Sequence, residues 1–192
     1  MKRLLFVCIL LVGCLVAGRA QQIVFRNYSV ADGLPSSTVR AIAQDHQGYL
    51  WFATKNGLSR FDGYQFKSFQ HNAAIPNSIG NNFIHCITVF DSTHLWVGTE
   101  NSFFILDLET EQFVQFEPLK GKTIFDIYKD SDGRVWITTR FNGLFRYHPE
   151  SRQLEQFVAD GREGSISRNE VTKIAADLNG NIWVGTYGGG IN

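Results

Sequence analysis

The stretch Leu50-Trp51-Phe52-Ala53-Thr54 has three further copies in this chain, each with tryptophan in the second position. The copies are Leu95-Trp96-Val97-Gly98-Thr99, Val135-Trp136-Ile137-Thr138-Thr139 and Ile182-Trp183-Val184-Gly185-Thr186. They contain all 4 tryptophans, which follow one another at intervals of 45, 40 and 47 residues. A period of about 40 to 50 residues is typical of β-propeller blades or helical solenoids. The residues around each copy decide between the two.

Ahead of each tryptophan, a short apolar run ends in aspartate and a turn follows. The runs are Val39 to Asp45, Ile84 to Asp91, Ile124 to Asp130 and Val171 to Asp177. The turn residues are Gln47-Gly48, Ser92-Thr93, Asp132-Gly133 and Asn179-Gly180. This order predicts a β-hairpin in each repeat.

Behind each tryptophan, a second turn and two more strands are expected. The turns are Asn56-Gly57, Asn101-Ser102, Asn142-Gly143 and Gly188-Gly189-Gly190. The third strands are Leu58 to Asp62, Phe103 to Asp107, Leu144 to His148 and the short Ile191-Asn192. Fourth strands follow with large apolar residues three apart: Phe66 and Phe69, Phe113 and Phe116, Leu154 and Phe157. Four antiparallel strands per period make a propeller blade.

We therefore predict an all-β fold of β-propeller blades, each a four-stranded antiparallel sheet, in about four repeats. The tryptophan strands are apolar on both faces, as strands covered on both sides are, so all four indoles should be mostly buried. Blades are expected at residues 39–69, 84–116, 123–157 and 171–192, the last one truncated. Ile23 to Ser29 resembles an outer strand whose partners are missing. We therefore expect the blades to form an incomplete ring that is open at both ends.

Residues 1–20 have the pattern of a cleavable signal peptide. Lys2 and Arg3 precede the apolar run Leu4 to Ala17, and small residues surround Arg19. Such a segment predicts export and a mature protein at 21–192, located in the periplasm. Two alternatives stay open: Leu11 to Cys14 resembles a lipoprotein processing site, and the apolar run could remain as a membrane helix.

Composition and charge narrow the function classes. The chain has 16 Phe, 6 Tyr and 18 Gly but only 4 Pro, which favours strands and tight turns. Lys and Arg number 18 and so do Asp and Glu; removing the three cations of the signal segment leaves the mature chain slightly acidic. Nucleic acid is therefore not an expected partner, because phosphate binding needs a concentrated basic surface.

No catalytic, cofactor-binding or metal-binding residue is predicted. Asp130-Ser131-Asp132-Gly133 begins like a calcium loop, but Phe141 stands where the twelfth-position glutamate belongs. The five histidines, His46, His71, His85, His94 and His148, lack metal-ligand spacing. Cys86 is expected to be a buried, inert thiol. No Gly-x-Ser-x-Gly elbow is present.

Ligand-binding residues are left unassigned. Propellers bind through loops at one mouth of their channel, because rigid strands there hold variable turns. The candidate segments are the turns at Asn56, Asn101, Asn142 and Tyr187 and the long connection from His71 to Asn82. Sequence alone does not choose among them.

The first repeat resembles the two-component regulator propeller family. The resemblance rests on Tyr28 to Pro35, on Val39 to Asp45, on Gly48-Tyr49-Leu50-Trp51 and on Gly57 to Gly63. Membership implies a periplasmic sensor portion followed by a β-sandwich, a membrane helix and a histidine kinase, with the full receptor in the inner membrane. The chain is then expected to be an N-terminal fragment of such a receptor, with no enzyme activity of its own and no cofactor.

Members of the Bacteroides type resemble sensors of oligosaccharides, so the resemblance implies an oligosaccharide ligand. It also implies contact with the remainder of the receptor and a homodimer in the full-length protein. Two alternative functions remain: a propeller-type periplasmic lyase or hydrolase, and a purely structural scaffold.

Overall fold

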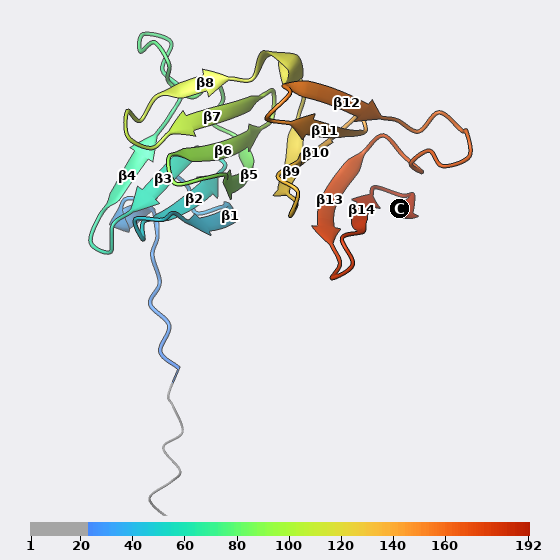
Figure 1. The fold of residues 1–192 in the computed structure, drawn as a ribbon. Helices are drawn as coiled ribbons and strands as arrows, with labels where there is room; N and C mark the ends of the chain where they lie inside the picture. Colours follow the sequence, from blue (N-terminus) through green and yellow to red (C-terminus); the bar gives the residue numbers. More distant parts are fainter. Residues whose placement is uncertain (1–22) are drawn as a thin grey trace, which may run out of the picture.

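The computed structural model describes residues 23–192, which form four antiparallel sheets of consecutive strands (Figure 1). The predicted signal peptide at 1–20 lies outside the described residues. The first sheet holds β1 (Val39–Gln44), β2 (Leu50–Thr54), β3 (Gly57–Phe61) and β4 (Phe66–Phe69); the second holds β5 (Ile84–Val89), β6 (His94–Thr99), β7 (Phe103–Asp107) and β8 (Phe113–Gln115).

The third and fourth sheets continue this order. The third holds β9 (Ile124–Lys129), β10 (Val135–Thr139), β11 (Leu144–His148) and β12 (Gln153–Phe157); the fourth holds β13 (Val171–Ala176), β14 (Ile182–Thr186) and β15 (Gly190–Ile191). Two short 3-10 helices, η1 (Val30–Asp32) and η2 (Glu117–Leu119), lie in connections. The predicted all-β propeller fold is confirmed. In residues 23–192 no helix has the length and apolar character needed to cross a membrane.

Neighbouring sheets pack against each other in chain order, as the arc in Figure 1 shows. Three apolar clusters fill the spaces between them. Trp51 and Leu58 meet Ile87 and Val97 between the first two sheets, and Trp136 meets Val184 between the last two. The tryptophan face of each sheet thus packs on the aliphatic face of the next, which is why both faces of these strands are apolar.

An aspartate at the end of the inner strand holds the tryptophan in three of the four blades. The indole Nε1–H donates to Asp45 in the first blade at 2.7 Å, to Asp130 in the third at 2.8 Å and to Asp177 in the fourth at 3.1 Å. The other carboxylate oxygen accepts two backbone N–H groups of the hairpin turn in each case. One side chain therefore fixes both the turn and the indole.

These hydrogen bonds favour the ionised carboxylate. Burial, the largest single influence, raises the pKa of Asp130, but bonds from Trp136 and Arg134 together outweigh it and leave the pKa below its ordinary value. Hydrogen bonds from Asn181 and then Trp183 lower the pKa of Asp177 to about 2. Both turns are thus held by a full negative charge at neutral pH.

The second blade departs from this arrangement. Its backbone turn places Phe90 where the other blades have aspartate, because the Phe90 N–H bonds the His94 carbonyl as Asp45 N–H bonds that of Tyr49. The Phe90 ring stacks on Trp96 with centroids 4.1 Å apart. Asp91, one residue later, still caps the turn by accepting the N–H groups of Thr93 and His94. Stacking replaces the hydrogen bond here.

The prediction that all four tryptophans are mostly buried is wrong for Trp183. Trp51, Trp96 and Trp136 are 1%, 4% and 8% exposed, whereas Trp183 is 46% exposed. The tryptophan face of the fourth sheet has no further sheet packed on it within residues 23–192. Trp183 occupies the same position in its blade as the other three tryptophans. A tryptophan at this position is buried only where a neighbouring sheet packs on it.

The first sheet has the complementary free face. Ile42 is 62% exposed, although its counterparts Ile87 and Ile127 are buried against a preceding sheet. Part of this face is covered by the segment before β1. The Tyr28 ring lies 5.1 Å from Phe61 and 5.7 Å from Phe66, and Leu34 is buried. The prediction that Ile23 to Ser29 is an outer strand is wrong, because no residue of this segment lies in a strand.

Replacing Trp96 by Ala should lower the free energy of unfolding by about 3 to 5 kcal/mol, because a closed cavity remains between two sheets. Trp183→Ala is the matched control and should cost no more than about 2 kcal/mol, because half of that side chain is already in water. Urea denaturation followed by circular dichroism measures both. Equal losses in the two variants would contradict the packing argument.

The chain spanning 21–192, studied alone in dilute buffer, should self-associate through its two free sheet faces, because exposed apolar faces associate unless covered. Ile42→Thr should shift the gel-filtration profile towards monomer, whereas Val114→Thr, on an exposed outer strand, should not. A monodisperse monomer for the unmodified chain would show that these faces do not attract.

Candidate ligand-binding site

Each inner strand carries a β-bulge at the same place. The pairing of β1, β5, β9 and β13 with the tryptophan strand skips one residue next to the start of the strand. The skipped residues are Arg40, His85, Phe125 and Thr172. A bulge redirects the side chain of its extra residue. All four side chains line one cavity of about 340 Å³, together with Glu170, Lys173 and Tyr187.

A second set of residues stands beside the bulges. In each blade the residue after the tryptophan-strand threonine donates its N–H to the carbonyl of the residue just before the inner strand. These residues are Lys55, Glu100, Arg140 and Tyr187. We call these four residues and the four bulge residues the mouth positions, because they meet where the inner strands begin.

The mouth positions vary in a chain whose framework repeats. The residue before each bulge is always aliphatic: Val39, Ile84, Ile124 or Val171. The threonine hydroxyl of every blade donates to the backbone across the turn: Thr54, Thr99, Thr139 and Thr186. The mouth positions hold cations, an anion, an imidazole, aromatics and a hydroxyl instead. The shared framework does not dictate these side chains, so they are free to serve recognition, although His85 is also buried.

In the second blade the two mouth positions bond directly. His85 Nε2 lies 2.6 Å from Glu100 Oε2, and Arg140 donates to the other Glu100 oxygen at 3.4 Å. The imidazole is buried between the rings of Phe83, at 4.8 Å, and Phe125, at 5.1 Å. Burial lowers the pKa of His85, and the bond to Glu100 only partly offsets it. A neutral imidazole therefore donates from Nε2 to Glu100.

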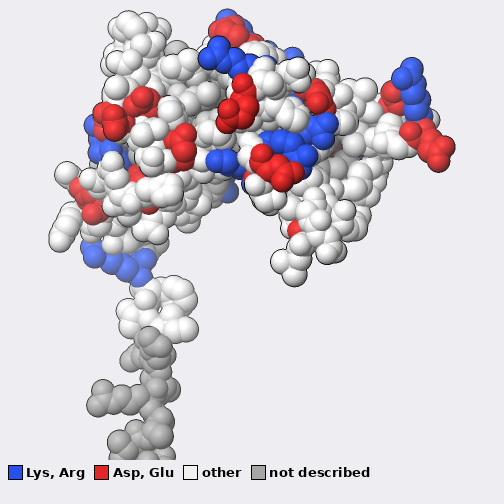
Figure 2. Space-filling view, in the orientation of Figure 1, with Lys and Arg blue, Asp and Glu red and all other residues white. Residues whose placement is uncertain are grey.

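Ion pairs neutralise some of the charges near the cavity. Lys173 lies 3.2 Å from Asp126, and Arg140 pairs with Glu100. Figure 2 shows acidic and basic side chains interspersed over one face of the molecule, with no area of a single sign. Any charge preference of the site must therefore come from individual unpaired groups.

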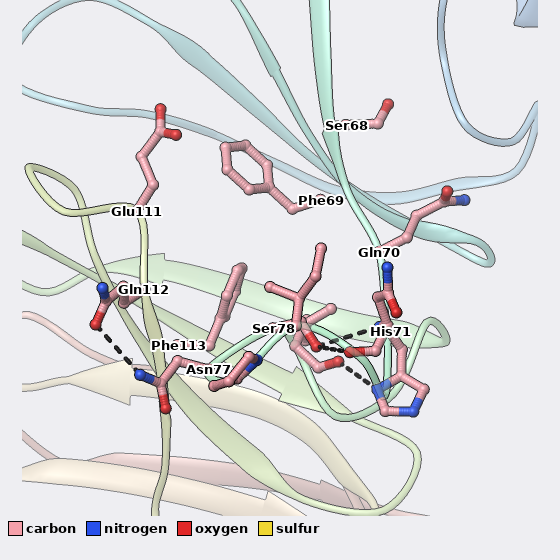
Figure 3. A pocket seen from close by; sticks show the side chains of 13 residues that line it. Ser68, Phe69, Gln70, His71, Asn77, Ser78, Glu111, Gln112 and Phe113 are labelled. Carbon is pink, nitrogen blue, oxygen red and sulfur yellow. Dashed lines mark hydrogen bonds between the residues drawn. The ribbon is translucent and has the colours of Figure 1, made fainter.

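A second cavity of about 480 Å³ lies at the rim between the first and second blades (Figure 3). Its polar groups already bond one another. His71 Nδ1 lies 2.9 Å from the Ile79 carbonyl, and the Asn77 amide donates to Gln112 at 3.3 Å. The Asn77 carbonyl also accepts the N–H of Phe113 on β8. The connection from 71 to 82 thus ties the two blades together, which is a structural role.

Of the segments proposed from sequence, the Tyr187 turn lines the mouth cavity and the connection from His71 to Asn82 lines the rim cavity. Asn56, Asn101 and Asn142 each bond the threonine of their own turn, Thr54, Thr99 and Thr139, and the Asn56 side-chain amide also donates to the Pro35 carbonyl before β1. Arg40, His85, Phe125 and Thr172 were missed. Comparing the four repeats position by position identifies them, because their chemistry changes from blade to blade while the aliphatic residue before each of them repeats.

Two residues weighed from sequence have structural roles. The Asp130 carboxylate is taken up by the bonds to Trp136, Arg134 and the turn, so the calcium-like segment is a hairpin. Cys86 is buried beside Ile124, and burial raises the pKa of its thiol. Among residues 23–192 no group of three or more potential ligands is placed to hold a metal ion.

Acidification should destabilise the protein through His85. Because the folded state lowers its pKa, the unfolded state binds the proton first, and stability falls as pH drops below about 6.5. His85→Gln should lessen this fall between about pH 7 and about pH 5.5, measured by urea denaturation at each pH. His46→Gln, in an exposed turn, is the control and should leave it unchanged. The same pH dependence in the His85 variant would contradict a buried neutral imidazole.

Comparison with known proteins gives one family. The family model for the two component regulator propeller matches residues 33–56 and 118–141. A curated relative, histidine kinase P4 of Formosa agariphila, is 43% identical over 56 residues, which are 29% of this chain and 4% of that protein.

Solved structures agree with the fold. The extracellular domain of BT4673 from B. thetaiotaomicron, described as a proposed one component system, superposes with a TM-score of 0.72 at 28% identity, over 83% of this chain and 22% of that chain. Virginiamycin B lyase from Staphylococcus aureus superposes with a TM-score of 0.60 at 18% identity, over 83% of this chain and 56% of that chain, a likeness of fold alone. The chain thus spans a small part of its relatives, and residues 33–56 and 118–141 are similar to the two component regulator propeller family.

Proposed function

We propose that these blades are the ligand-sensing portion of the extracytoplasmic region of a two-component sensor histidine kinase, and that an oligosaccharide binds at the mouth positions. The observation that carries the proposal is the ring of four bulges. One position per blade changes from Arg to His to Phe to Thr, and all four side chains line one cavity. A scaffold without a ligand has no need of such a ring.

The chemistry of the cavity suits a sugar. Phe125 and the exposed Tyr187 offer aromatic faces, on which the C–H side of a pyranose packs. Thr172, Glu170 and Arg40 offer donors and acceptors for hydroxyl groups. The volume of about 340 Å³ lies within the range of small-molecule sites.

The family supports the remainder of the proposal. The histidine kinase of Formosa agariphila carries a 56-residue stretch similar to this chain, and the extracellular domain of BT4673 carries a similar fold, each as part of a longer chain. By analogy the blades would lie in the periplasm and contact further receptor domains, with the full-length receptor forming a homodimer in the inner membrane. The blades themselves would perform no catalysis.

A lyase or hydrolase is the alternative that one observation favours. His85 and Glu100 form a histidine–carboxylate pair at the cavity, the arrangement of a general base. Two facts weigh against it: Nδ1, the nitrogen free to take a proton, is buried with no partner among the described residues, and burial lowers the pKa of the ring. A base must reach its substrate.

Isothermal titration calorimetry of the protein against a panel of oligosaccharides tests the proposal. At least one sugar should bind, and Phe125→Ala or Tyr187→Ala should weaken it about tenfold or more, which corresponds to ~1.4 kcal/mol. Leu178→Ala, which removes a fully exposed apolar side chain from the turn at the opposite strand ends, should bind normally.

The outcomes separate the three functions. Binding lost only in the two mouth variants supports the sensor. Failure of every sugar to bind would favour the structural scaffold. Release of shortened or unsaturated products during the titration, abolished by His85→Gln, would favour the enzyme.

A further inference from the structure

Two cations of the first blade stand apart from the ion pairs of the mouth. Arg40 is the bulge residue of β1, and Lys55 follows the threonine of β2. Within residues 23–192 neither has a carboxylate within 4.0 Å, although Arg140 and Lys173 at the same mouth do. The nearest mouth carboxylate in the next blade, Glu100, is already shared by His85 and Arg140.

Both cations converge on one aromatic ring. The Arg40 guanidinium carbon lies 5.6 Å from the centroid of Phe83, and the Lys55 ammonium lies 5.8 Å from it. The two cation–π contacts hold both side chains at the Phe83 ring without neutralising them. The positive charge of Arg40 also acts on the second blade. Burial and then the bond to Glu100 affect the pKa of His85 most, and the charge of Arg40 lowers that pKa further.

The opposite side of the cavity has the opposite character. Glu170, just before β13, and Thr172, near its start, both line it. The Thr172 hydroxyl donates to the Gly185 carbonyl at 3.1 Å, so both side chains offer acceptors to the hydroxyl groups of a sugar, and the carboxylate repels an anion. The cavity is therefore polarised: the unpaired Arg40 lines it at the first blade, with Lys55 near the same Phe83 ring, whereas at the fourth blade Glu170 is an acceptor and the cation Lys173 is paired with Asp126.

We propose that the mouth selects an acidic sugar, whose carboxylate or sulfate is bound by Arg40 and Lys55 while its hydroxyl groups face Glu170 and Thr172. This inference rests on the proposed function and names its ligand class. Bonds between ionised partners are about twice as strong as neutral ones. A neutral sugar would leave the two cations solvated and would gain nothing from their position.

The test compares each acidic oligosaccharide with its own neutral form. The probes are glucuronate, galacturonate and mannuronate oligosaccharides, their carboxyl-reduced counterparts, and a sulfated galactose oligosaccharide, all titrated calorimetrically at low and at moderate salt. An acidic form should bind at least about tenfold tighter than its neutral counterpart, and salt should reduce the difference, because screening weakens exposed charges. Comparing the affinities of the uronate oligosaccharides with that of the sulfated galactose oligosaccharide shows which anion is preferred.

Variants assign the preference to the two cations. Arg40→Gln should lower the ratio of acidic to neutral affinity to about twofold or less, and Lys55→Gln should lower this ratio in part. Arg40→Lys should keep most of the preference for the acidic form, as expected of a contact between charges. Lys120→Gln removes an exposed lysine that pairs with Glu117 in η2, and should leave the preference intact. Arg40 and Lys55 are exposed, so unchanged thermal melting can establish that the variants fold.

Three results would overturn the inference. If neutral sugars bind as tightly as acidic ones, and Tyr187→Ala still abolishes binding, the proposed sensor function is supported and the proposed selection of acidic sugars is wrong. If Arg40→Gln keeps the full preference, the cations are not its source. If no sugar of either kind binds, the proposed function fails and this inference fails with it.

Discussion

The blades depend on one hydrogen bond, from a buried indole N–H to an aspartate at the end of the inner strand. A tryptophan placed between two sheets brings a large apolar area and one donor that favours a hydrogen-bond partner. The aspartate accepts that donor at 2.7 Å in the first blade and also caps the hairpin turn leading to the tryptophan strand. Turn, strand pairing and sheet packing are thus linked through one carboxylate. The second blade shows what the bond can be exchanged for, because Phe90 takes the aspartate position and stacks on Trp96.

This link explains how the chain separates fold from function. Tryptophan, aspartate, threonine and the aliphatic residue before each bulge recur because packing and turn geometry demand them. The bulge lies directly beside this framework yet contributes nothing to the ladder, since its residue is the one that pairing skips. Its side chain can therefore change from Arg40 to Thr172 at little cost in stability. A rigid frame with freely variable positions at one end is the usual basis of a binding site.

The sequence was sufficient for the blades because their determinants are local and repeated. The turn residues and the apolar runs lie within a single period, and the tryptophans mark how the period repeats. The positions of the strands could therefore be predicted closely from the sequence. Trp183 was predicted wrongly because its burial depends on a neighbouring sheet, which a local pattern does not describe. The mouth cavity needed the structure, since His85 and Tyr187 lie about a hundred residues apart in the chain and only the arc of inner strands brings them together. The displaced aspartate of the second blade is visible in the sequence, because Asp91 precedes Trp96 by five residues whereas the other aspartates precede their tryptophans by six. The stacking of Phe90 on Trp96 needed the structure.

A ligand at the mouth would act on the spacing of the blades rather than on one of them. The cavity is lined by Arg40, His85, Phe125 and Thr172, one from each sheet, so a molecule that contacts several of them favours a particular distance between the inner strands. The sheets meet through closely packed apolar clusters that resist compression, which means that a shift at one interface is passed to the next instead of being absorbed. A differential affinity for one spacing is all that a ligand needs to shift a conformational equilibrium. The same stacking of tryptophan on aliphatic faces that holds the arc together would thus carry the signal along it.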